Sequence, residues 1–263
     1  RGDPSAAAAG LKPGLRLPLR SGGWTGRGCR CRLALMLLAA LCLCLPQADA
    51  AVAAPFGVQV VDAETGRGVP LVELETVHRL RFVTDSAGWA AIAEPGLMGR
   101  EVWFTVRSHG YEYRADGFGY RGARLLVEPG GRARLELERL NLAERLYRVT
   151  GEGVYRDSLM LGLEAPVARP LLNGGVLGQD SVLTAVYRGE LFWIWGDTNR
   201  AAYPLGNFHA SGARSTLPER GGLDPAVGVD LRYFVGADDF SKRMCPMDAP
   251  GPVWLDGFAA LPD

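Results

Sequence analysis

The region that follows the first fifty residues contains almost no cysteine. Four of the five cysteines lie before Ala50: Cys29, Cys31, Cys42 and Cys44. Only Cys245 follows it, so a chain processed near that point cannot form an internal disulfide. This excludes the disulfide-stapled class of small secreted domains. A lone cysteine in "RMCPMD" is more often packed than catalytic, and we assign it no role.

The sequence also lacks an excess of charge, with 29 basic and 29 acidic residues. This balance argues against a generally basic nucleic-acid binder. No G-x-G-x-x-G or G-x-x-x-x-G-K-[ST] motif supports nucleotide binding. The scattered histidines, His78, His109 and His209, lack the spacing of a zinc site. The sequence "GQDSVL" around Ser181 is no G-x-S-x-G elbow, so a serine hydrolase has little support.

One long hydrophobic run is present, and it lies near the start. A basic leader, Arg1 to Arg32, precedes the apolar stretch Leu33–Leu45, and "ADA" follows at Ala48–Ala50. This order predicts a secretory signal within residues 1–50. The apolar stretch is shorter than the roughly 20 residues of a membrane-spanning helix. We expect no permanent span after cleavage, with an uncleaved anchor as the alternative, and a secreted, periplasmic or cell-envelope bacterial protein.

The rest of the chain is rich in glycine and in short alternating apolar runs. It has 35 glycines and 17 prolines, and 48% of all residues are hydrophobic. This composition predicts an all-β fold. The expected strands of a small β-sandwich at 55–140 are 56–62, 71–76, 79–85, 89–93, 100–108, 123–129 and 132–140. The last two flank a "GG" turn and predict a hairpin.

A resemblance appears in "VVDAETGRGVPLVELET" and "FVTDSAGWAAI". Both stretches resemble the transthyretin-like, carboxypeptidase-regulatory-like sandwich of secreted bacterial proteins. Asp62 and Thr65 are placed to bind turn amides, Gly66 and Gly68 to allow positive φ, and Asp85 to begin the next turn. The resemblance implies an accessory module without a catalytic group.

Residues 141–150 are expected to be a linker, in which "NLAERL" forms one helical turn capped by Asn141. A different pattern follows, with longer loops rich in Gly, Pro and Asp. Strands are predicted at "GEGVYRDSLMLG", "VDLRYFV" and "GPVWLDGF". The "RG" dipeptide between "VLTAVY" and "ELFWIW" predicts a tight hairpin.

The strand 190–195 is apolar on both faces. Leu191, Trp193 and Trp195 share one face, while Phe192 and Ile194 share the other. A strand covered on both sides is typical of the centre of a stacked β-architecture such as a propeller blade. This favours a core position for Trp193, whereas Trp195 lies next to the loop "GDTN".

Asp180 and Asp197 bracket this hairpin, so both should lie at the same rim. Two adjacent carboxyls can separate their pKa values and act as acid and base in glycoside hydrolysis. They can also bind a hard cation, or accept turn amides as Asp beside Gly commonly does. The turn role is favoured, and the ligand and metal roles remain alternatives.

"GQDSVLTAVYRGELFWIWGDTN" and "YPLGNFHASGA" resemble opening blades of five-bladed propellers of the arabinanase and levansucrase group. The resemblance implies a glycoside-hydrolase-like partial β-propeller at 151–263, with Asp180 as general base or nucleophile and Asp197 as its partner. Trp195, Asn199 and His209 would bind the sugar. Only about 115 residues follow Tyr147, so we expect a truncated propeller and a fragment of a longer chain.

The sequence thus predicts a secreted or envelope protein with an accessory sandwich and a candidate glycoside hydrolase. The alternative is a non-catalytic module that binds a cell-surface glycan or a protein. We expect no cofactor and no metal site. The acids of "GADDFSK", Asp238 and Asp239, offer a calcium alternative, but a solvated turn is favoured.

Overall fold

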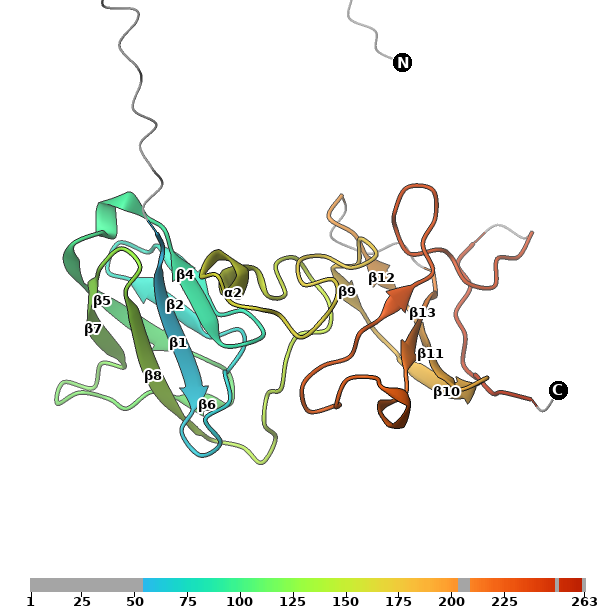
Figure 1. Ribbon diagram of the computed structural model, residues 1–263, viewed down its shortest axis with the longest axis horizontal. Helices are drawn as coiled ribbons and strands as arrows, with labels where there is room; N and C mark the ends of the chain where they lie inside the picture. Colours follow the sequence, from blue (N-terminus) through green and yellow to red (C-terminus); the bar gives the residue numbers. More distant parts are fainter. Residues whose placement is uncertain (1–53, 203–208, 249–250, 262–263) are drawn as a thin grey trace, which may run out of the picture. The chain divides into compact units, whose positions relative to one another are not determined.

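The computed structural model describes residues 54–202, 209–248 and 251–261. The expected leader and signal at 1–50 lie outside the described residues. The described chain is largely β, with four small open sheets and one short α-helix (Figure 1). None of its helices is long and apolar enough to cross a membrane.

Two four-stranded sheets in the first half share one hydrophobic core. Their strand orders are β4-β1-β8-β6 and β3-β2-β5-β7. The strands are β1 (Phe56–Asp62), β2 (Glu73–Thr76), β3 (Arg81–Val83), β4 (Trp89–Ile92), β5 (Arg100–Arg107), β6 (Tyr111–Glu112), β7 (Gly122–Val127) and β8 (Arg132–Arg139), with a 3₁₀ turn at Pro95–Leu97. Strands β1 and β8 are parallel, and the other pairs are antiparallel. Val60, Leu74, Phe104 and Leu137 are fully buried between the sheets.

Two turns of the first sheet pack against each other through glycine. The amides of Glu64 and Thr65 donate to Asp62, as expected. Gly88 has φ of +76°, and a Cβ on Gly68 would lie 2.0 Å from the carbonyl oxygen of residue 87. Gly68 is therefore required for close backbone approach rather than for the positive φ that we predicted.

The predicted hairpin between residues 123–129 and 132–140 is wrong, although both strands exist. β7 pairs with β5 in one sheet, and β8 pairs with β1 and β6 in the other. The turn bond from the Gly131 amide to the Glu128 carbonyl redirects the chain, and the Gly57 amide then donates to Gly131. The glycine pair thus carries the chain from one sheet to the other.

The α-helix of the described residues, α2 (Arg156–Met160), lies where we predicted a strand. The Asp157 side chain accepts the Ala91 amide of edge strand β4 at 2.9 Å. It thereby satisfies an N–H group at the edge of the sheet, and α2 packs against that edge where another strand could have paired. The helical turn predicted in "NLAERL" is wrong: residues 141–146 adopt no helix.

The second half contains a four-stranded antiparallel sheet in the order β10-β11-β13-β14 and a two-stranded pair β9-β12. Their bounds are β9 (Gly178–Gln179), β10 (Leu183–Tyr187), β11 (Glu190–Trp195), β12 (Thr198–Asn199), β13 (Ser211–Thr216) and β14 (Arg232–Tyr233), with a 3₁₀ turn at Pro218–Arg220. The predicted β10-β11 hairpin is confirmed, and positive φ at Arg188 and Gly189 suits its two-residue turn.

The described residues form no propeller, and the region predicted as one, residues 151–263, contains a single four-stranded sheet in its described part. The strand predicted at 251–258 is absent, and that predicted at 229–235 shrinks to β14. β13, which we did not predict, occupies the centre of the sheet beside β11.

Asp85 is a buried carboxylate that accepts three backbone amides and so joins its own turn to α2. One oxygen accepts the amides of Ala87 and Trp89 at 3.0 and 3.1 Å, and the other accepts the Ser158 amide of α2 at 2.7 Å. Burial raises the pKa of Asp85 against the lowering effect of hydrogen bonds from Ser158, Trp89 and Ala87. The residue therefore fixes its own turn and the helix at once.

Replacing Asp85 with alanine should lower the free energy of unfolding by about 2–4 kcal/mol, because three N–H groups lose their acceptor. Asp116 is the matched control, since it accepts Phe118 and Tyr120 amides in the same pattern but in an exposed loop. Asp116→Ala should cost about 1 kcal/mol or less, because water replaces the acceptor. Urea denaturation measures both changes, and equal losses would contradict the assignment.

Glu75 of β2 is a second buried acid, and it forms ion pairs with three arginines. Its side chain is 4% exposed and contacts Arg79, Arg81 and Arg107 at 2.9, 2.8 and 3.2 Å. Burial alone would raise the pKa of Glu75, but hydrogen bonds from Arg81 and Arg79 and the charge of Arg107 outweigh it. The net effect holds the pKa below its ordinary value.

A lowered folded-state pKa means that ionised Glu75 favours the folded state. This contribution is complete above the ordinary value of 4.5 and is lost as the pH falls through the folded-state pKa. We expect Glu75→Gln to flatten the stability profile in this acid range. Glu136→Gln, which breaks an exposed pair with Arg134, should leave the profile unchanged. Denaturation midpoints measured across acid pH test this, and identical profiles for both variants would contradict it.

Candidate functional site

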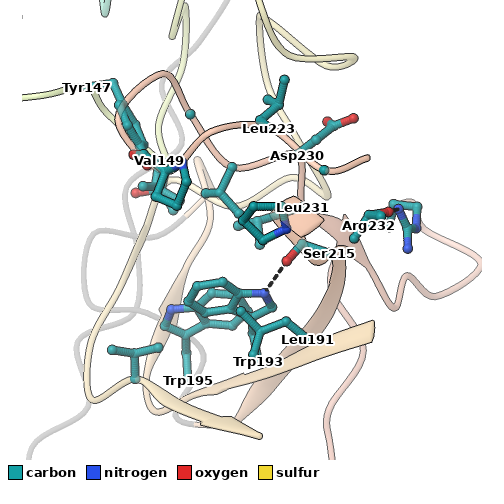
Figure 2. Close-up of a pocket in the computed structure, with 18 of the residues that line it drawn as sticks. Tyr147, Val149, Leu191, Trp193, Trp195, Ser215, Leu223, Asp230, Leu231 and Arg232 are labelled. Atoms are coloured by element: carbon teal, nitrogen blue, oxygen red, sulfur yellow. Dashed lines mark hydrogen bonds between the residues drawn. The ribbon is translucent and has the colours of Figure 1, made fainter. Parts of the chain in front are cut away.

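A mainly apolar cavity of about 510 Å³ lies over one face of the sheet β10-β11-β13-β14. Its floor is formed by Leu191, Trp193 and Trp195 of β11, which share one face as predicted. Its other walls come from the segment 147–150 and from residues 215–232 (Figure 2). The lining is mainly apolar, with Thr150, Gln179, Ser215, Thr216, Asp230 and Arg232 as its polar members.

The two tryptophans of the floor stack on each other, with ring centroids 5.9 Å apart and an angle of 6° between the rings. Figure 2 shows them on the opposite side of the cavity from Val149 and Leu223. The indole N–H of Trp193 donates to Ser215 at 2.9 Å, which fixes the ring. Trp195 is 8% exposed, whereas Trp193 remains partly exposed. The predicted burial order is therefore reversed, because Trp195 packs against Leu231.

A polar chain lies beside Trp195. Gln179 accepts the Tyr233 hydroxyl at 2.7 Å and donates to Ser211 at 2.6 Å, and Thr198 also donates to Ser211 at 2.7 Å. Burial raises the pKa of Tyr233 despite the hydrogen bond to Gln179, so its hydroxyl stays protonated. These groups satisfy one another and hold β9, β12, β13 and β14 together.

The structure brings Asp180 and Asp197 together at the end of the hairpin. The carboxylate of Asp180 accepts the Asp197 amide at 3.0 Å. The backbone carbonyl of Asp180 accepts the Gly196 amide at 2.9 Å. The Asp197 carboxylate accepts the indole N–H of Trp254 at 3.1 Å. Neither aspartate lines the cavity. Their contacts are those of the turn role, and the catalytic role remains a prediction.

The other predicted sugar-binding residues are not gathered in the cavity. Asn199 lies in β12, where its carbonyl accepts the Leu177 amide at 2.9 Å. His209 packs edge-to-face on Phe240 and lines a separate shallow depression with Arg200. Of the predicted binding residues, only Trp195 reaches the cavity.

The contacts of Asp238 do not support the alternative of a calcium site at Asp238 and Asp239. One oxygen of Asp238 pairs with Arg200 at 2.9 Å, and the other accepts the Phe240 amide. The hydrogen bond from Arg200 is the main cause that lowers the pKa of Asp238. In the part of the chain that the structure describes, no three His, Cys, Asp or Glu side chains are grouped to hold a metal.

Sequence reasoning missed β13 and its contribution to the site. Ser211, Ala213 and Ser215 alternate along "SGARST" and lie opposite Trp195, Trp193 and Leu191 in the register. Small residues opposite tryptophans leave room for the rings on that face. The alternation of small side chains was the available signal, but it lacks the apolar pattern that identifies strands.

Comparison with known proteins adds no family to this description. A scan against models of protein families finds no match, and a search of curated proteins finds no relative.

The close approach of Gly196 to Asp180 provides a test of the turn role. A Cβ on Gly196 would lie 2.3 Å from the Asp180 carboxylate oxygen, so Gly196→Ala must displace that side chain. We expect a loss of about 1–3 kcal/mol in the free energy of unfolding. Gly257→Ala, with open space around its Cβ, is the control and should cost less than about 0.5 kcal/mol. Similar stabilities for the two variants in urea denaturation would rule out a tight turn.

Proposed function

We propose that this chain is a non-catalytic glycan-binding protein, secreted or held in the bacterial envelope, whose sugar site is the cavity over Trp193. The observation that carries the proposal is the stacked tryptophan floor of that cavity. Its volume of about 510 Å³ lies within the range of about 300–1,000 Å³ common for small-ligand sites.

Trp193 supplies the feature that a sugar ring requires. Its ring is fixed by Ser215 and remains partly exposed, so one face can receive the C–H groups of a pyranose. An aromatic face carries partial negative charge, which attracts these C–H groups. Thr150 and Asp230 line the same cavity and can bind sugar hydroxyls.

The position of the two acids favours binding over hydrolysis. A glycosidase needs its carboxyls on either side of the scissile bond. Asp180 and Asp197 instead accept hydrogen bonds from the Asp197 amide and the Trp254 indole, and neither lines the cavity.

Two inferences about the fold accompany this function. We infer that residues 55–140 are a transthyretin-like accessory sandwich, which the shared core of two four-stranded sheets supports. We also infer that the sheet β10-β11-β13-β14 is a single blade of propeller type. Its four antiparallel strands and central β11 support this inference.

A glycan array followed by titration with the best-bound glycan tests this function. Trp193→Ala should weaken binding at least tenfold, because it removes the stacking surface. Trp254→Ala is the matched control, since Trp254 is 53% exposed and lies outside the cavity lining. Unchanged affinity in Trp193→Ala would move the site elsewhere.

The same glycan should show no reducing-end release with either the unaltered chain or Asp180→Asn. Asparagine retains an oxygen that can accept the Asp197 amide, so the hairpin end should stay intact. Release by the unaltered chain that disappears in Asp180→Asn would replace the binding proposal with a glycosidase.

A further inference from the structure

The outer face of the sheet β3-β2-β5-β7 carries an indole ring that lies against the strands. Phe104 and Val106 of β5 enter the core, so Trp103 and Thr105 point to the opposite face. The indole N–H of Trp103 donates to Thr105 at 3.2 Å, which directs the ring along its own strand. Trp103 remains partly exposed.

Gly122 of β7 makes room for this ring. It pairs with Thr105, and a Cβ on Gly122 would lie 2.7 Å from Cζ2 and 2.8 Å from Cε2 of Trp103. The six-membered part of the indole therefore covers the glycine. Any larger residue would push the ring off the sheet. One side of the ring faces the backbone at Gly122, and the residue is partly exposed to solvent.

One arginine lies next to Trp103 on this face, and three more lie further along it. Arg124 lies directly opposite Trp103 in the register and is exposed. Within residues 54–202, 209–248 and 251–261, Arg124 makes no hydrogen bond or ion pair. Further along the face, Arg79, Arg81 and Arg107 are 76%, 59% and 51% exposed and share one carboxylate, Glu75.

The guanidinium groups outnumber the acids on this face. Glu73 and Glu101 also point outward, and Glu75 is covered by its three arginines. Two exposed charges therefore lie next to Trp103, Glu101 two residues earlier on β5 and Arg124 directly across on β7. An arginine recognises a carboxylate through two parallel hydrogen bonds, so an acidic ligand complements this position.

We propose that this surface, formed by Trp103, Gly122 and Arg124, is a second binding site that takes an acidic polysaccharide. The pyranose ring of a uronic acid stacks on Trp103, and its carboxylate pairs with Arg124. Arg107 and Arg81 extend the positive surface toward the next sugar. This site uses no residue of the Trp193 cavity.

Affinity electrophoresis of the full chain in gels that contain polygalacturonate tests the proposal. We expect polygalacturonate to retard the unaltered chain. The affinity derived from this retardation should fall at least tenfold in Trp103→Ala and in Arg124→Glu. Phe118→Ala is the matched control, because it removes an aromatic that is 89% exposed in the preceding loop. Trp193→Ala should retain the retardation, which separates this site from the proposed function. Circular dichroism verifies that each variant is folded.

Two further gels decide what the surface recognises. A neutral galactan should give no retardation, because it offers no carboxylate to Arg124. Dextran sulfate supplies anionic charge on a different sugar and should retard the chain less than polygalacturonate. Absence of retardation by polygalacturonate overturns the site, as does retardation that persists in Trp103→Ala. Retardation of the unaltered chain by dextran sulfate as strong as that by polygalacturonate overturns it in favour of charge alone.

Discussion

A reciprocal pair of buried carboxylates connects the two-sheet core to the chain that follows it. Asp85 accepts the Ser158 amide of α2, and Asp157 of α2 accepts the Ala91 amide of β4. Each side of the contact thus supplies an acceptor to the other. Ser86 strengthens the connection, because its amide donates to Val154 and its hydroxyl accepts the Arg148 amide. The segment 147–150, which walls the cavity, is therefore held by residues next to Asp85.

The cavity depends on this arrangement for one of its sides. Its floor belongs to β11, but Tyr147 and Val149 come from the segment that is hydrogen-bonded to the earlier sheets. Removing that segment would leave Trp193 on an open sheet face. The polar side chains of the site also form two sets. Those near Trp195, in the chain from Tyr233 through Gln179 and Ser211 to Thr198, are hydrogen-bonded to one another. The polar side chains that we assign to the ligand, Thr150 and Asp230, lie on the segments that wall the cavity opposite β11.

Strands with strong alternation were predictable from the sequence, and their partners were not. The bounds of β1 match the prediction at Phe56 and Asp62, because its apolar pattern is bounded by turn residues. The partners of β7 and β8 were missed, since a "GG" turn suits a hairpin and a change of sheet equally well. The face shared by Trp193 and Trp195 followed from the two-residue period. Their burial depended on Leu231 and Ser215, which lie far along the chain and carry no local signal.

The parallel pairing of β1 with β8 joins the first strand of the two-sheet core to its last. Val58 lies opposite Ala133, about 75 residues further along the chain. Such distant pairing costs loop-closure entropy before any contact repays it, and it slows folding. The central position of β1 therefore cannot be completed while β8 is still missing. A chain that emerges from its N-terminal end must keep β1 unpaired on that side until residues 132–137 have appeared.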